Sequence, residues 1–161
     1  MKHLFVASLL VFLSAQAWSC GCSAIASMDD AVAFYPTLVE VEVVSREEVN
    51  SEFGRGVRSV TLRVKNVLKG ETAETIVVNR GMCYSSLYPE LMKPQHTYVL
   101  PLAAPVKGRY EMAHCSHSGM ELIDGKLYTF EEPPNGKDRQ LKFYKPYSAL
   151  QHMFPSSAPI Q

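Results

Sequence analysis

One segment of the sequence decides the fold class: residues 57–68, which read VRSVTLRVKNVL. Apolar and polar side chains alternate along this segment, so that Val60, Leu62 and Val64 fall on one face of an extended chain. Alternation with a period of two predicts a β-strand that has one buried face and one solvated face. The sequence around this segment is therefore expected to form a sheet.

Four other segments carry a similar strand signal. They are residues 37–44, 75–79, 96–102 and 109–113. The polar stretch 47–56 is expected to connect the first two strands as a hairpin, and Lys69-Gly70 is expected to form a turn. Five short strands at these intervals predict a mainly β protein, built as a small closed or nearly closed barrel.

Two short helices are predicted beside the sheet. Ser27 stands before residues 28–34, which have aspartates in their first turn, and a serine cap with an acidic first turn marks a helix N-terminus. A last helix is expected to start near Pro146 and to run to Phe154, because Pro155 stops it. Two other segments are expected to be irregular: the exposed, charged loop 131–139 and the flexible tail 156–161.

Residues 1–19 are expected to be a cleaved secretory signal peptide. Lys2 precedes the apolar run 4–13, and the small-residue segment 14–19 follows it. A basic start, a short apolar run and an A-x-A-like end are the parts of such a signal, and the run is too short to span a membrane. We therefore expect a secreted chain, extracellular or periplasmic, with a single domain at residues 20–155 and no transmembrane segment after processing.

Two cleavage positions fit this signal, and they leave different N-termini. A cut after Ala17 leaves Trp18 and Ser19 at the start of the mature chain, whereas a cut after Ser19 leaves Cys20 there. An acylated lipoprotein is a third interpretation, although the residues before Cys20 do not form a leucine-led box of small residues.

The cysteines predict disulfide bonds. The chain has four, at Cys20, Cys22, Cys83 and Cys115, and an even set in an oxidising compartment indicates two bridges. A bridge between Cys20 and Cys22 would close a strained ring of three residues. Each of these two cysteines is therefore expected to pair with Cys83 or Cys115, which leaves two pairings open.

The charge balance argues against nucleic-acid binding. Lys and Arg together number 16, and Asp and Glu also number 16, so the chain has no excess of positive charge for phosphates. Basic and aromatic residues alternate in residues 142–147. We expect Phe143 and Tyr147 to pack this last segment onto the barrel while its lysines stay in solvent.

No catalytic constellation is recognisable in the sequence. Ser118-Gly119 lacks the G-x-S-x-G elbow of serine hydrolases, and an even set of bridged cysteines leaves no thiol nucleophile. His114 and His117 are interpreted as surface residues, and the acidic pairs Asp29-Asp30 and Glu131-Glu132 as solvated turns. The chain is therefore expected not to be an enzyme, to need no cofactor and to hold no metal permanently.

The order of these motifs resembles the netrin-like domain that is shared with tissue inhibitors of metalloproteinases. The resemblance covers about residues 20–122 and is carried by short motifs in the same order. These are the Cys20-Gly21-Cys22 motif, the strand end Val43-Val44, the segment 64–70, Cys83, the strand Tyr98-Val99-Leu100 and Cys115. It implies an OB-like five-stranded β-barrel with one or two flanking α-helices, and the disulfides Cys20–Cys83 and Cys22–Cys115.

The resemblance also implies a function. In the inhibitors of this family, the N-terminal α-amine and the carbonyl of the first cysteine chelate the catalytic zinc of a target protease and displace its water. Cys20 would take this role here, with Gly21, Cys22 and Ser23 as the wedge that contacts the protease. The partner would then be a zinc metalloprotease, and the amine would be free only after a cut following Ser19.

Gly21 departs from the inhibitors of the family, which usually have Thr or Ser between the two cysteines. That side chain enters the specificity pocket of the protease, and its loss would cost on the order of 1–3 kcal/mol of binding. Glycine also fits a backbone that must turn between two bridges. The alternative function is therefore a non-inhibitory module for protein interaction or envelope assembly, in which Cys20-Gly21-Cys22 is only a covalent staple.

Overall fold

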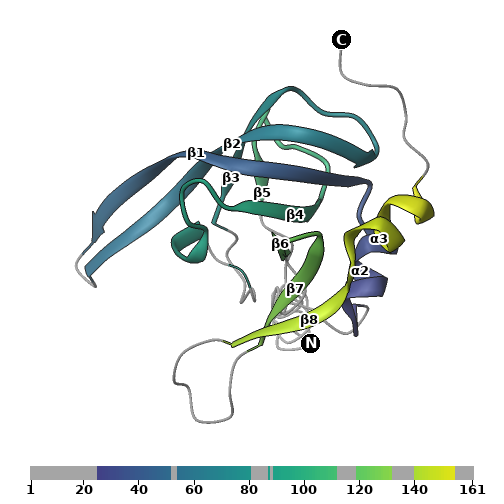
Figure 1. Ribbon diagram of the computed structural model, residues 1–161. Helices are drawn as coiled ribbons and strands as arrows, with labels where there is room; N and C mark the ends of the chain where they lie inside the picture. Colours follow the sequence, from purple (N-terminus) through teal and green to yellow (C-terminus); the bar gives the residue numbers. More distant parts are fainter. Residues whose placement is uncertain are drawn as a thin grey trace, which may run out of the picture.

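The computed structural model describes residues 25–51, 54–80, 87, 89–111, 119–131 and 140–154. Most of these residues lie in one curled sheet of eight strands, which forms about half of a barrel (Figure 1). The expectation of a mainly β protein with two helices is confirmed. No helix in this part of the chain is long and apolar enough to cross a membrane.

The longest element is the hairpin of β1 (Thr37–Ser51) and β2 (Gly54–Lys69), whose outer half projects as an arm (Figure 1). The two strands pair in antiparallel fashion from Leu38↔Lys69 to Ser51↔Gly54, with four shifts of register. The prediction of a connecting segment at 47–56 is therefore wrong. Pairing continues because main-chain hydrogen bonds need no apolar side chains, and both faces of a projecting arm can be solvated.

The remaining strands extend this hairpin on both sides. They are β3 (Thr75–Asn79), β4 (Thr97–Leu102), β5 (Tyr110–Glu111), β6 (Met120–Ile123), β7 (Lys126–Glu131) and β8 (Gln140–Pro146). The order across the sheet is β5-β3-β2-β1-β4-β6-β7-β8, and every neighbouring pair is antiparallel except β3 and β5. Strands β4-β1-β2-β3 have the spatial order of a Greek key, in which the fourth strand returns beside the first.

Strands β6, β7 and β8 are absent from the sequence prediction, and Glu131 belongs to β7 and not to a loop; residues 132–139 lie outside the described residues. The turn between β6 and β7 is Asp124-Gly125, with φ of +48° and +72°. An Asp-Gly pair is a strong signal for a two-residue hairpin. β8 has no such signal, because its side chains are exposed along most of its length.

Two hydrophobic clusters lie on opposite faces of the central strands. In the first, Val39 and Val41 of β1 pack with side chains of β2 to β5. In the second, Leu38 of β1 and Val99 of β4 pack with the two helices α2 (Met28–Phe34) and α3 (Tyr147–Met153). Both helices agree with the sequence prediction, and a short 3₁₀ helix, η1 (Pro89–Leu91), lies before β4.

Gly70 lies at the predicted turn after β2, with φ of +77°, and a Cβ there would lie 2.5 Å from the carbonyl oxygen of Pro36. Gly125 has a similar φ of +72° but open space around it.

We expect Gly125→Ala to lower the free energy of unfolding by about 1–2 kcal/mol, because alanine is strained in the left-handed backbone conformation. Gly70→Ala should cost about 1–3 kcal/mol more because the chain must move away from Pro36. Urea unfolding of both variants measures the difference, and equal losses would contradict the close approach.

Candidate functional site

The residues predicted to carry the function lie outside the described residues: Cys20, Gly21, Cys22 and Ser23, together with the predicted disulfide partners Cys83 and Cys115. The described chain begins at Ile25, which is 9% exposed and belongs to the second hydrophobic cluster. Helix α2 begins three residues later, at Met28. The contacts of α2 therefore determine how firmly the chain is held directly after the predicted wedge.

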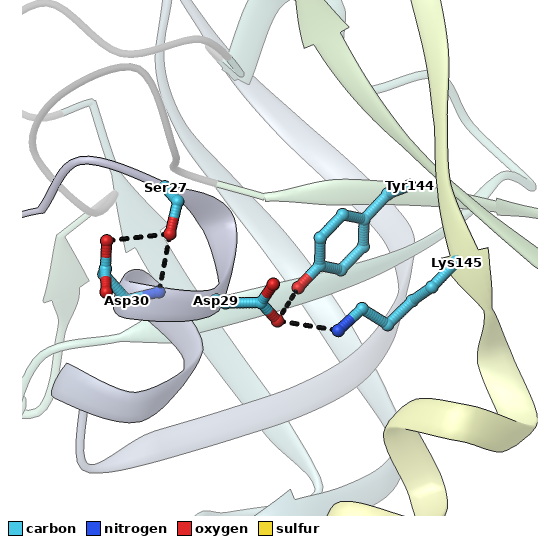
Figure 2. Close-up of polar contacts among 5 residues, drawn as sticks. All are labelled: Ser27, Asp29, Asp30, Tyr144 and Lys145. Atoms are coloured by element: carbon cyan, nitrogen blue, oxygen red, sulfur yellow. Dashed lines mark hydrogen bonds and ion pairs between the residues drawn. The ribbon is translucent and has the colours of Figure 1, made fainter.

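The N-terminus of α2 is capped by Ser27. The backbone N–H of Asp30 donates to Ser27 Oγ at 3.1 Å, and Ser27 Oγ donates to a carboxylate oxygen of Asp30 at 2.7 Å (Figure 2). The cap satisfies one of the N–H groups that the first turn leaves without a partner, and the acidic side chains favour the positive end of the helix dipole. This cap was predicted from the sequence.

Asp29 joins α2 to β8. Its Oδ1 accepts hydrogen bonds from the hydroxyl of Tyr144 and from Lys145 Nζ, the latter at 2.6 Å (Figure 2). Hydrogen bonds from Lys145 and then Tyr144 lower the pKa of the Asp29 carboxyl, whereas burial followed by the bond to Asp29 raises the pKa of Tyr144 to about 12. Asp29 therefore lies in a helix and pairs with two side chains of β8, although its own side chain stays 59% exposed, which corrects the prediction of a solvated turn for this residue.

Lys145 completes this contact. Its Nζ lies 4.3 Å from the centre of the Tyr144 ring, and its side chain is only 20% exposed. Burial lowers the pKa of Lys145, but the hydrogen bonds with Asp29 and Tyr144 outweigh it and raise the pKa overall. The expectation that the lysines of residues 142–147 stay in solvent is wrong for this one, because Asp29 provides it with a counter-ion.

The other end of α2 is held by β2. Lys69 Nζ donates to the carbonyl oxygens of Val32 and Ala33, at 3.2 and 2.8 Å. The last carbonyl groups of a helix lack partners within the helix, and a cation there also complements the helix dipole. Between the two ends, Met28, Ala31 and Val32 are buried. We call this set of contacts, made by Ser27, Asp29 and Lys69 with their partners, the α2 clamp.

Tyr147 is the first residue of α3, and its hydroxyl links this helix to the sheet. Its hydroxyl donates to Glu40 of β1 and accepts from the side-chain amide of Asn66 of β2 at 3.5 Å. Burial, followed by the bond to Glu40, raises the pKa of the Tyr147 hydroxyl above its ordinary value. The prediction that Tyr147 packs against the sheet is confirmed.

A shallow hollow of about 270 Å³ lies beside the clamp, between the start of α2 and strands β7 and β8. Glu131 and Lys142 form an ion pair of 2.8 Å across it. Phe143 lines the hollow, is 52% exposed and makes an edge contact with the ring of Tyr128, with ring centres 6.0 Å apart. Phe143 was expected to pack this last segment onto the barrel; it contacts the neighbouring strand β7 but stays half exposed, because β8 is the last strand of the sheet.

A buried carboxylate was missed entirely. Glu121 of β6 is 5% exposed and bonds to Nδ1 of His96, whose ring stacks on Tyr98. Burial raises the pKa of Tyr98 to about 12, and its hydroxyl accepts the N–H of Lys93 at 2.8 Å. Within the described ranges, no group of three or more His, Cys, Asp or Glu could hold a metal ion. His114, His117, Ser118 and Glu132 lie outside those ranges.

The Asp29 contact predicts a pH-dependent stability. Its pKa lies below the unfolded value of about 3.9, so the stability it contributes is complete above that value and is lost as the pH falls through the folded-state pKa. Asp29 is 59% exposed, which limits the effect. At pH 7, Asp29→Asn should cost about 0.5–1 kcal/mol more than Asp30→Asn, a matched change in the same helical turn without a lysine partner. The difference should shrink as the pH falls below the unfolded value of about 3.9 in urea unfolding experiments, and equal losses at pH 7 would exclude a contribution from Lys145.

The α2 clamp thus fixes the first described helix at both ends, through side chains of β2 and β8 that are distant in the sequence. Comparisons of the chain with models of protein families, with curated proteins and with solved structures gave no match.

Proposed function

We propose that the protein is a secreted, netrin-like inhibitor of a zinc metalloprotease that resembles the tissue inhibitors of metalloproteinases. In this proposal the α-amine and carbonyl of Cys20 chelate the zinc of the target, and Gly21, Cys22 and Ser23 form the contact wedge. The bridges are Cys20–Cys83 and Cys22–Cys115. The zinc belongs to the target enzyme, so the protein itself needs no cofactor and performs no catalysis.

The α2 clamp is the observation that supports this proposal most directly. Chelation by two backbone atoms of one residue requires a segment that is already ordered, because ordering it on binding would reduce the affinity. Five residues after Cys20 the chain enters the core at Ile25, and α2 is fastened at both ends directly beyond it. The two proposed disulfides would constrain the wedge further, because they tie Cys20 and Cys22 to distant parts of the chain.

The strand order supports the proposed OB-like barrel. Strands β5-β3-β2-β1-β4 are contiguous in the sheet and are the first five strands of the described chain. An OB-fold is a partly open, five-stranded Greek-key barrel, and strands β4-β1-β2-β3 have the Greek-key order. In our proposal these five strands make the barrel, and β6, β7 and β8 extend one of its edges toward α2.

A second function is favoured by the exposed strand β8. Leu141 and Phe143 are 42% and 52% exposed on a strand at the edge of the sheet. Such an edge can pair with an extended segment of another protein without any zinc. The alternative proposal is therefore an interaction or envelope-assembly module, in which the paired cysteines only staple the N-terminal segment.

A terminal extension tests the inhibitor proposal. Mature protein that begins at Cys20 should inhibit a zinc metalloprotease, and the same protein with one alanine added before Cys20 should lose about a hundredfold or more in affinity, because the amine is then displaced from the zinc. Both proteins have the same fold, bridges and strand β8. Full protease activity at micromolar concentrations of the unextended protein, across a panel of such enzymes, would exclude chelation and leave the interaction module.

The proposal also predicts a pH profile and a processing site. A chelating amine must be neutral, and its reference pKa is about 7.7, so inhibition should weaken as the pH falls below this value.

N-terminal sequencing of the secreted protein should give Cys20 as the first residue. Trp18 is the only tryptophan of the chain, so the mature protein should also lack tryptophan fluorescence. A mature chain that starts at Trp18 would contradict the chelation mechanism.

A further inference from the structure

The hairpin of β7 and β8 has an apolar face that the other described residues leave partly uncovered. Phe130 of β7 packs against the first hydrophobic cluster, and Tyr128, two residues earlier, lies on the same face of the strand. Leu141 of β8 lies opposite Phe130, and Phe143 lies opposite Tyr128. Because directly opposite side chains share a face, these four form one stripe, which we call the β7–β8 apolar face. Leu141 and Phe143 are 42% and 52% exposed, so the outer half of this face lies in solvent.

The outer edge of β8 is also unpaired in the described sheet. β8 is the last strand in the order of that sheet, so one side of its main chain makes no ladder bonds with a described strand. Edge strands are often protected by charged side chains. The two lysines of β8 are instead paired within the chain: Lys142 Nζ lies 2.8 Å from Glu131, and Lys145 Nζ lies 2.6 Å from Asp29. Both charges of β8 are therefore balanced before any second strand approaches.

These ion pairs restrict the chemistry of a partner for this edge. Each lysine of β8 already has a carboxylate, so neither an acidic nor a basic segment finds an unpaired counter-ion on the strand. The edge favours a strand whose own charges are balanced and whose apolar residues lie on one face. β8 of a second copy has this pattern, since Leu141 and Phe143 alternate with Gln140 and Lys142. The chain has 16 basic and 16 acidic residues, so two copies carry no net charge that would oppose their association.

Two copies of β8 can pair about a two-fold axis. Identical strands that run in opposite directions present the same edge to each other, and the interface closes after two copies. The apolar faces of the two hairpins join only in registers that place like faces opposite each other. With Phe143 at the axis, Lys142 lies opposite Tyr144 of the second copy, so that no lysine faces a lysine. A register centred on Lys142 would place like charges opposite each other, which is destabilising.

We propose that the protein forms a two-fold dimer in which β8 pairs in antiparallel fashion with β8 of a second copy. Leu141 and Phe143 of the two copies then form one apolar stripe across the joined sheets. The register shift between β7 and β8 leaves Tyr144 as an extra residue, which interrupts the regular ladder, so the interface is small. We expect a weak dimer, with a dissociation constant on the order of 10–100 µM. The proposal rests on the β8 edge of the alternative function and names its partner; it does not involve Cys20 or zinc.

Sedimentation equilibrium of the mature protein from about 5 to 500 µM tests the proposal, and the mean mass should rise from that of a monomer toward that of a dimer. Leu141→Lys and Phe143→Lys should each weaken association by about tenfold or more, because each places an ammonium group in the apolar stripe. Both positions are exposed, so both variants should fold. The matched control is Val106→Lys in the turn between β4 and β5, a position that is 66% exposed; it should change association less than about twofold.

Hydrogen exchange locates the surface that the dimer uses. The main-chain amides of residues 140–146 should exchange more slowly at the high concentration than at the low one, whereas those of β5, at the opposite edge of the sheet, should not change. Leu141→Lys should remove this dependence on concentration. A dimer whose β8 amides exchange equally at both concentrations uses another surface and would overturn the proposal. A monomer throughout the range would also overturn it and leave the β8 edge to a different protein, and neither result bears on zinc chelation.

Discussion

The whole structure depends on burial of the central strands β1 and β4 on both faces. Val39 and Val41 of β1 face one hydrophobic cluster while Leu38 faces the other, and in β4 the buried Val99 lies opposite Tyr98 and Leu100. Each fully buried aliphatic side chain of this kind contributes about 1.5–3 kcal/mol. Because the two clusters share these strands, the sheet and the helices that cover it are stabilised together.

Helix α2 shows how this core supports a short element. Seven residues are too few for a helix to be stable alone in water, so α2 must be stabilised by its tertiary contacts. Two sets of tertiary contacts supply this, the pairing of Asp29 with Tyr144 and Lys145 and the bonds from Lys69 to the last carbonyls, and a local serine cap adds to them. Lys69 and Gly70 have separate roles here: Lys69 bonds to the end of α2, and Gly70 allows the close approach of the chain to Pro36.

The sequence predicted those parts of the fold whose signals are local. The alternation of residues 57–68 gave the type and place of β2, and Ser27 with its acidic turn gave the start of α2. The arm of the hairpin was missed because its polar residues resemble a loop, and β8 because an exposed edge strand has no alternation of buried and solvated residues. Asp29 and Glu121 were missed as partners because nothing near them in the sequence identifies Lys145 or His96. The wedge at residues 20–23 stays a prediction.

The separation of the clamp residues along the chain has a consequence for the order of folding. The β1–β2 hairpin joins neighbouring segments, whereas Asp29 is 115 and 116 residues away from Tyr144 and Lys145. Contacts between distant residues form late, because the chain between them must first lose its conformational freedom. The hairpin can therefore form early, but α2 cannot dock until β8 is in place. The segment proposed to reach the zinc of a protease would then be among the last to become rigid, so a chain that ends before β8 would form much of its sheet and still lack a competent N-terminus.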